Sequence, residues 1–265
     1  MTALPPVPPK QSLGQNFLVD PNIARKLVAA LGPRPDEPVL EIGPGGGALT
    51  EILVEQGAHV IAVEIDERLI PGLRENFGDR IELTHADILS VDLTAVAQRH
   101  GGRLVVLGNL PYYSSSPILF HLIAHRAALG RCVLTLQREV VDRCCARPGT
   151  KDYGSLTVQL MLAAAPRRLF TISPQVFRPR PKVESAVLAL DFSPSNLPQP
   201  TSWPTLEQVV RAAFNQRRKT LRNALGARFG QEATDRMLAE AGIAPQIRAE
   251  DVPPEGFVAL AEAAK

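Results

Sequence analysis

The tetrapeptide Asn109-Leu-Pro-Tyr112 holds the groups best suited to chemistry in this 265-residue sequence. An aromatic amine is a poor nucleophile because its lone pair is delocalised into the ring, so a reaction there needs acceptors that draw its hydrogens toward pyramidal geometry. The side-chain oxygen of Asn109 and the carbonyl of Leu110 can supply two. Pro111 fixes the backbone so that they converge, and Tyr112 offers a ring on which a flipped-out base can stack. The alternative is an ordinary type I turn, since Asn and Pro are common turn residues.

A glycine-rich loop follows the apolar run Val39–Ile42 and precedes a helical segment, Leu49–Gln56. Its glycines stand where a backbone must pass close to a ligand. Gly43, Gly45 and Ala48 also satisfy the dinucleotide pattern GxGxxG/A, so the loop alone predicts a nucleotide-type site without choosing the ligand.

Three carboxylates at the ends of successive apolar runs narrow that choice. Glu41 precedes the loop, where it would repel a pyrophosphate but could hold the amino-acid end of S-adenosylmethionine. Glu64 lies about 20 residues further on, where a carboxylate can accept both ribose hydroxyls. Asp87 could accept from the amino group of the cofactor's adenine. Each acid alone is more typical of a solvated surface, but ligands of open α/β sheets bind at the carboxyl ends of the strands.

A sulfonium already carries a good leaving group, so methyl transfer from it depends on positioning and electrostatics, and needs no general base. The ring of Tyr112 could also favour the cation. The loop, the acids and the tetrapeptide together predict methyl transfer to the N6 amino group of adenine.

These groups need parallel strands that end at one edge of a sheet. From Pro21 to about Phe192, short apolar runs alternate with helical segments, which predicts an α/β fold with a mostly parallel sheet covered by helices. We expect strands at residues 39–42, 59–64, 81–83, 104–107, 132–136 and 186–192. Asp20-Pro21 predicts the start of the first helix, with a carboxylate at the N-cap and a proline in the first turn.

Prolines divide the chain into domains. Residues 193–204 hold four prolines and several small polar residues, which excludes a helix or a central strand and predicts a linker. Residues 206–214, 220–229, 232–241 and 255–263 have helical spacing and no strand pattern. We therefore predict a catalytic domain at 1–192, a linker at 193–204 and a small helical RNA-binding domain at 205–265.

The composition is that of an ordinary globular protein, with 45% hydrophobic residues, 21% charged residues and a net charge of +2. No apolar run approaches the ~20 residues of a membrane span, and the N-terminal arm has no signal or transit pattern. Three cysteines form no CxxC pair, which predicts a reducing compartment, the cytoplasm, and no metal site at Cys144 and Cys145. Nothing requires more than a monomer.

Basic residues without acids form a run between Gln208 and Gln231. Such a run is usually a solvated helix face, but like charges at helical spacing cost stability unless a polyanion offsets them. A second basic patch, beside Phe177, would lie at the mouth of the site, and both patches predict contacts with RNA phosphates. The predicted RNA-binding residues are Arg178, Arg180, Lys182, Arg217, Arg218, Lys219 and Arg222, and the run also contains Arg211 and Arg228.

Together the motifs resemble the ribosomal RNA adenine dimethylase family of class I methyltransferases over nearly the whole chain. The matching segments are Gln15–Leu18, Glu41–Gly47, Val63–Asp66, Asp87, Asn109–Tyr112 and Phe177–Ser185. The resemblance implies that Asn16 and Leu18 fold over the cofactor and that Gly43, Glu64 and Asp87 bind it.

The same resemblance implies that Asn109 touches both the cofactor and the target amine. It places Phe177 on the face of the target base opposite Tyr112. Without the resemblance, Phe177 is more simply interpreted as a core anchor.

Two segments, residues 12–18 and 214–225, resemble the branch of the family that acts on the small ribosomal subunit. That branch dimethylates two neighbouring adenosines in a hairpin loop near the 3′ end of 16S rRNA, during ribosome biogenesis. Four alternatives stay open: the antibiotic-resistance branch that methylates large-subunit rRNA, a DNA adenine methyltransferase, a catalytically silent RNA-binding assembly factor and a dinucleotide oxidoreductase.

Overall fold

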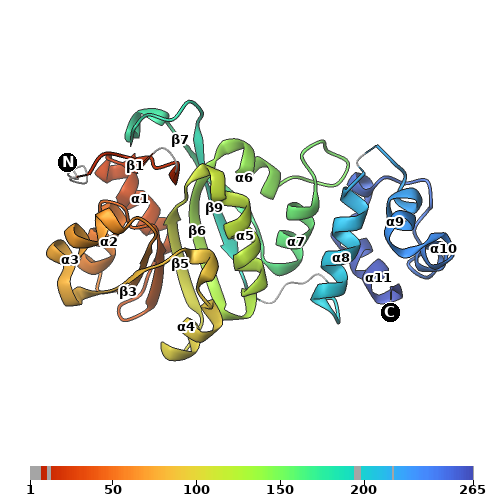
Figure 1. Cartoon of the computed structure of the whole chain (residues 1–265), viewed down its shortest axis with the longest axis horizontal. Helices are drawn as coiled ribbons and strands as arrows, with labels where there is room; N and C mark the ends of the chain where they lie inside the picture. Colours follow the sequence, from red (N-terminus) through yellow and green to blue (C-terminus); the bar gives the residue numbers. More distant parts are fainter. Residues whose placement is uncertain (1–6, 11–12, 194–197, 217, 265) are drawn as a thin grey trace. The chain divides into compact units, whose positions relative to one another are not determined.

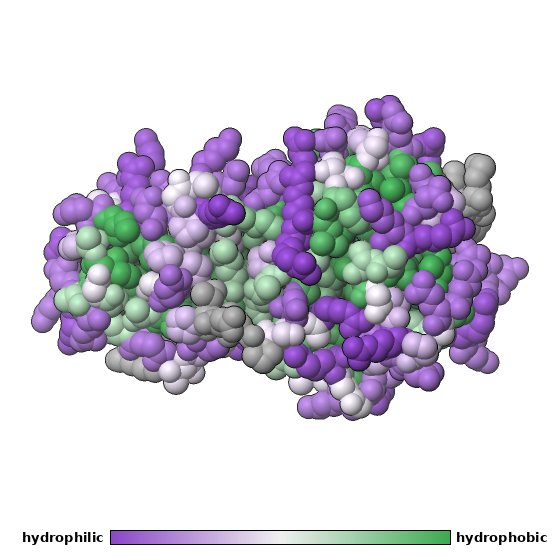
Figure 2. Space-filling view, turned by 180° about the vertical axis from the view of Figure 1, so that it is seen from behind, coloured by the Kyte–Doolittle hydropathy of each residue, from purple (hydrophilic) through white to green (hydrophobic). Residues whose placement is uncertain are grey.

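The computed structural model describes residues 7–10, 13–193, 198–216 and 218–264. The chain forms two compact units, one of residues 1–141 and 167–193, the other of residues 142–166 and 194–265. No helix in the described part of the chain is both long enough and apolar enough to cross a lipid bilayer. Hydrophilic side chains cover much of the face shown in Figure 2, with apolar residues in separate patches between them.

A seven-stranded sheet forms the centre of the first unit, in the order β4-β3-β2-β5-β6-β9-β7. Its strands are β2 (Pro38–Ile42), β3 (His59–Glu64), β4 (Ile81–His85), β5 (Leu104–Asn109), β6 (Leu129–Gln137), β7 (Arg167–Ile172) and β9 (Ser185–Asp191). The strands from β4 to β6 run parallel, whereas β9 is antiparallel to both of its neighbours. The order of connection reverses between β2 and β5, and such a switch point leaves a crevice at the carboxyl ends of the strands.

Helices surround this sheet (Figure 1). They are α1 (Pro21–Leu31), α2 (Ala48–Glu55), α3 (Ile70–Phe77), α4 (Leu93–Arg99) and α5 (Ser115–Ala124). The next helix, α6 (Arg138–Cys144), begins in the first unit and ends in the second. The predicted start of α1 is confirmed: Asp20 Oδ1 accepts hydrogen bonds from the backbone N–H groups of Asn22 and Ile23, with Pro21 in the first turn. The predicted α/β class and the six predicted strands are also confirmed, with ends that differ by up to three residues.

Three strands have no signal in the sequence. A two-stranded ribbon pairs β1 (Phe17–Leu18) with β8 (Phe177–Arg178) in antiparallel register. Two residues are too few to show the alternation that marks a strand. The third is β7, an edge strand whose residues are mostly exposed, so burial imposes no apolar pattern on it.

The second unit is helical, with α7 (Ser155–Ala163), α8 (Trp203–Phe214), α9 (Leu221–Phe229), α10 (Gln231–Glu240) and α11 (Pro254–Ala263). It includes residues 142–166, which the sequence pattern assigned to the first domain. Tyr153 explains this difference, because its fully buried ring packs against Phe214 and its hydroxyl donates to the carbonyl of Val252 at 2.9 Å.

The linker predicted at 193–204 includes residues 194–197, which lie outside the described residues. Its last residues are helical, since α8 begins at Trp203 with Ser202 as its N-cap. Pro204 does not prevent this, because a proline in the first turn of a helix removes no helical hydrogen bond.

Candidate active site

A pocket opens at the carboxyl ends of β2, β3, β4 and β5, within the first unit. Its empty volume, counted out to the open mouth, is about 1230 Å³. Most of the predicted catalytic and cofactor-binding residues line it: Asn16, Leu18, Gly43, Gly45, Glu64, Asp87, Asn109, Leu110, Pro111 and Tyr112. Glu41 and Phe177 are not part of the lining.

The glycine loop has a backbone that only glycine adopts readily. Gly43, Gly45 and Gly47 have φ angles of +68°, +58° and +84°, in the region where a Cβ is strained. A Cβ on Gly43 would meet nothing within 4 Å, so the loop leaves open space there for a ligand. A Cβ on Gly47 would lie 2.6 Å from the ring of Phe77, which fixes the position of the loop over α3.

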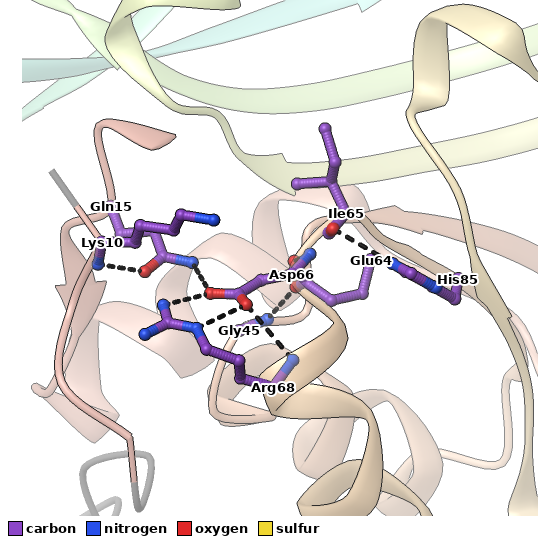
Figure 3. A network of polar contacts seen from close by, with 8 residues as sticks. All are labelled: Lys10, Gln15, Gly45, Glu64, Ile65, Asp66, Arg68 and His85. Carbon is purple, nitrogen blue, oxygen red and sulfur yellow. Dashed lines mark hydrogen bonds and ion pairs between the residues drawn. The ribbon is translucent and has the colours of Figure 1, made fainter. Parts of the chain in front are cut away.

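Glu64 ends β3 with a carboxylate that the backbone holds in place. Its Oε1 accepts from the N–H of Asp66 at 2.9 Å, and its Oε2 accepts from the N–H of Gly45 at 3.0 Å (Figure 3). Burial raises the pKa of this carboxyl, and the two backbone hydrogen bonds oppose that rise. Each carboxylate oxygen has a second lone pair, so Glu64 can still accept the two hydroxyls of a ribose.

Asp87 follows β4 and lies on the same pocket. Its Oδ1 accepts from the N–H of Leu89 at 2.9 Å, which orients the carboxylate. Its second oxygen can accept a hydrogen bond from an amino group in the pocket.

Asp66 connects the N-terminal segment to the end of β3. No pattern in the sequence predicts this role. Figure 3 shows contacts from Gln15 and Arg68 converging on it: Gln15 Nε2 donates at 2.8 Å and Arg68 Nε at 2.8 Å. The backbone N–H of Lys10 donates in turn to Gln15 Oε1 at 2.7 Å. The hydrogen bond from Arg68 lowers the pKa of Asp66 to about 2, so Asp66 is ionised and holds Gln15 beside the pocket.

Glu41 is buried instead of facing the pocket. Its Oε2 accepts from Thr50 Oγ1 at 2.7 Å, and its Oε1 has no hydrogen-bond partner among the described residues. Burial raises the pKa of this carboxyl to about 7. Repulsion from the nearby Glu64 adds to this rise, so Glu41 stands close to one predicted cofactor ligand, but its side chain is enclosed beside Thr50 and does not line the pocket.

Asn109 ends β5 and contacts the N-terminal segment. Its Nδ2 donates to the backbone carbonyl of Asn16 at 2.9 Å, so its Oδ1 is left to accept. The N–H of Leu110 donates to the carbonyl of Thr135 at 3.0 Å, which anchors the next residue of the tetrapeptide to β6. Pro111 then turns the chain into a short 3-10 helix, Tyr112–Ser114, that leads into α5.

The ring of Tyr112 is held at its far end. Its hydroxyl shares a 2.7 Å hydrogen bond with Oγ of Ser185, a fully buried residue at the start of β9. Burial raises the pKa of Tyr112, so the phenol is neutral. Ser185 lies in the matched segment Phe177–Ser185, but no pattern in the sequence indicates this contact. The next residue, Tyr113, lies at the pocket with 57% of its surface exposed.

Phe177 lies in the hydrophobic core of the first unit and is 1% exposed. It pairs with Leu18 across the β1–β8 ribbon. Phe17, on the same ribbon, packs against the glycine loop, because a Cβ on Gly45 would lie 3.1 Å from its ring. The ribbon thus joins the segment that covers the pocket to the segment that carries the second basic patch.

The predicted RNA-binding residues differ in whether an acidic side chain already pairs with them. Arg178, Arg180 and Lys182 are exposed in the first unit. In the second, Arg218 and Lys219 are exposed, whereas Arg222 pairs with Asp235 through two hydrogen bonds of 2.5 and 2.7 Å. Arg217 lies outside the described residues.

A separate hollow between α8 and α9 is lined by Arg211 and Arg228. Its other six lining residues are all polar or small: Gln208, Ala212, Asn215, Gln216, Ala224 and Ala227. The sequence indicated these two arginines only as members of the basic run, and the structure shows that they face one hollow.

A mostly parallel sheet with a glycine loop at its switch point, an acid at the end of the next strand and an Asn-Leu-Pro-Tyr segment beside them defines a class I, Rossmann-like methyltransferase. Enzymes of this class depend on S-adenosylmethionine. The chain belongs to the ribosomal RNA adenine dimethylase family, whose model matches residues 9–265. The protein is accordingly an rRNA adenine methyltransferase.

Curated relatives agree with this assignment. The chain is 48% identical over 222 residues to "Ribosomal RNA small subunit methyltransferase A" of Salinibacter ruber, covering 84% of this chain and 75% of that one. It is 43% identical over 262 residues to the protein of the same name from Geobacter metallireducens, covering 96% and 94%.

Two solved structures share the fold over most of the chain. One is a dimethyladenosine transferase from Plasmodium falciparum, with a TM-score of 0.76, 24% identity and coverage of 92% of this chain and 95% of that one. The other is the 23S rRNA methyltransferase ErmE, with a TM-score of 0.68, 26% identity and coverage of 94% and 99%.

Proposed function

We propose that this enzyme dimethylates N6 of two adjacent adenosines in a hairpin loop near the 3′ end of small-subunit rRNA. The observation that carries the chemistry is the orientation of Asn109, whose amide nitrogen is occupied by Asn16 and whose oxygen is left to accept. The names of the 40–48% identical relatives support the small subunit as the substrate.

S-adenosylmethionine, when bound, supplies a methyl group on a sulfonium. Its proposed ligands are the residues whose polar groups already face the pocket. Glu64 would accept the ribose hydroxyls and Asp87 the adenine amino group, since each carboxylate is oriented by backbone N–H groups. The open space at Gly43 lets the cofactor approach the loop backbone, and the segment with Asn16 and Leu18 covers it.

The target base would enter from the side of the tetrapeptide. Asn109 Oδ1 and the Leu110 carbonyl accept the two hydrogens of N6, which localises the nitrogen lone pair for in-line attack. Tyr112 stacks on the base, with its ring held by Ser185. In this role the neutral phenol is an anchor and carries no proton in the reaction.

Exposed cations would bind the RNA backbone in each unit. Arg178, Arg180 and Lys182 serve in the first, and Arg218 and Lys219 in the second. Because phosphate contacts position RNA without reading its sequence, selection of adenine falls to the pocket. We propose a monomer that works on rRNA in the cytoplasm, away from any membrane, where the buried thiols of Cys132 and Cys144 stay reduced.

The proposal is tested by incubating the enzyme and labelled S-adenosylmethionine with unmodified small subunits, unmodified large subunits and duplex DNA, followed by nucleoside analysis. We expect label in N6,N6-dimethyladenosine from small subunits alone. Label chiefly from large subunits would assign the chain to the antibiotic-resistance branch, and label from duplex DNA would make it a DNA methyltransferase. Cofactor binding without transfer to any substrate would indicate a silent assembly factor.

A further inference from the structure

Three side chains that could bind a metal ion converge in the first unit, away from the cofactor pocket. His59 begins β3, Glu82 lies in the neighbouring β4, and His100 caps the carboxyl end of α4. One ligand atom from each lies within 4.8 Å of the other two. His59 Nε2 is 2.7 Å from Glu82 Oε1, and His100 Nε2 is 3.5 Å from Glu82 Oε2.

The Nε2 atom of His100 is buried and has no hydrogen-bond partner among the described residues. A buried polar atom without a partner costs free energy. The rings of His59 and His100 are 5.0 Å apart between centroids and tilted by 45°, so they do not stack face to face. Both imidazoles instead stand next to the same carboxylate, which is the arrangement of a chelate.

We propose that His59, Glu82 and His100 form a binding site for one Zn²⁺ ion or a similar transition metal. Zinc takes imidazole nitrogen and carboxylate oxygen at about 2.0–2.2 Å in tetrahedral geometry, which places ligand atoms roughly 3.3–3.6 Å apart. The donor atoms can reach that spacing through small rotations of the exposed side chains of His59 and Glu82 about the less exposed His100. The side chains of His59 and Glu82 are each 44% exposed, so water can fill the fourth position.

The ligand set selects among cations. Two imidazoles favour zinc, copper, nickel or cobalt over Mg²⁺ and Ca²⁺, which prefer oxygen. The metal site is also distant from the cofactor pocket. His59 and Glu64 stand at opposite ends of β3, about 16 Å apart at the usual rise per residue. The ion would therefore join β3, β4 and α4 and stabilise the sheet, without entering methyl transfer.

Titration of tag-free, chelator-treated protein with ZnCl2 in a calorimeter tests the site. We expect one Zn²⁺ per chain, and a melting temperature that rises by about 3 °C or more at a hundredfold excess over Kd. His59→Ala and His100→Ala should each weaken binding at least tenfold. His85→Ala is the matched control, since His85 lies at the other end of β4 on the carbonyl of Ile65, and it should bind zinc like the wild type.

Co²⁺ used as a second probe identifies the ligands. We expect a tetrahedral d–d spectrum without thiolate charge-transfer bands. This spectrum should disappear in His59→Ala, a change at an exposed residue that should leave the fold intact. Zinc binding that is equal in the wild type and His59→Ala would overturn the proposal. Thiolate bands would do so too, because they would place the ion on cysteine.

Discussion

The side-chain amide of Asn109 donates a hydrogen bond to the backbone carbonyl of Asn16 at 2.9 Å. The group proposed to receive the target amine is thus oriented by the segment that covers the cofactor pocket. Closure of that segment and recognition of adenine are linked through one hydrogen bond, so an enzyme with a displaced N-terminal segment would hold its acceptor in the wrong direction.

Replacing Asn109 by Ala should lower turnover much more than cofactor affinity. Removing one oriented hydrogen-bonding group that stabilises the charge developing in the transition state lowers kcat by about 10²–10³-fold. Binding of S-adenosylmethionine should weaken less, because Glu64 and Asp87 remain. Single-turnover methylation and calorimetric titration measure the two effects on a protein whose circular dichroism is unchanged. Turnover like that of the wild type would contradict the role of Asn109.

Tyr112→Phe should keep the stacking ring but lose its anchor on Ser185. A freely tilting ring positions the base less well, so we expect a fall of about threefold to tenfold in kcat, close to the net value of one hydrogen bond. Tyr112→Ala, which removes the ring, should lose far more.

Ser185→Ala removes the same hydrogen bond from the other side, and the double variant with Tyr112→Phe should be no worse than either single one. Additive losses would show that the two hydroxyls act independently.

Glu41→Gln should change how stability depends on pH. Burial raises the pKa of Glu41 to about 7 in the folded enzyme from 4.5. The folded state therefore holds a proton that the unfolded state has released, and wild-type stability falls as pH rises from about 4.5 to 7, then levels off. The total is about 3 kcal/mol.

Gln cannot ionise, so the stability of Glu41→Gln relative to the wild type should grow across that window. Urea denaturation of cofactor-free protein between pH 5 and pH 8 measures the difference. A constant difference between the two proteins across this range would show that Glu41 does not titrate there.

Arg218→Ala with Lys219→Ala should weaken binding to an rRNA hairpin. The slope of log K against log salt should fall by about 1 for each phosphate that the variant no longer neutralises. Both side chains are exposed. Arg222→Ala is the matched comparison, since Asp235 already pairs with Arg222, and it should change the slope less. Fluorescence anisotropy at several salt concentrations provides the measurement, and equal slopes for the double variant and the wild type would exclude these two cations from the RNA interface.

Much of the site could be predicted because apolar runs in the sequence show where the strands end. Gly43, Glu64 and Asn109 lie at the ends of buried apolar runs, and Asp87 follows the more exposed β4; the parallel order of these strands brings all four residues to one pocket. Glu41 shows the limit of this logic, because it lies within β2 and its side chain turns to Thr50 instead of the cofactor pocket.

Pairings between residues far apart in sequence could not be predicted. The pairing of Tyr112 with Ser185 and of Gln15 with Asp66 depends on how β9 and the N-terminal segment pack, and no local pattern records that. The same holds for Tyr153, whose burial with Phe214 places residues 142–166 in the helical unit. Phe177 lies in the core and not in the pocket because β8 pairs with β1.

The β1–β8 ribbon also sets an order of events during synthesis. Its first strand emerges from the ribosome early, but Leu18 can pair only after Phe177 has been translated. A nascent chain that ends before β8 therefore lacks the β1–β8 pairing that holds Phe17 against the glycine loop. Such a chain should bind the cofactor weakly. Competence to bind the methyl donor would then arise late in translation, at nearly the same time as the last strand of the sheet.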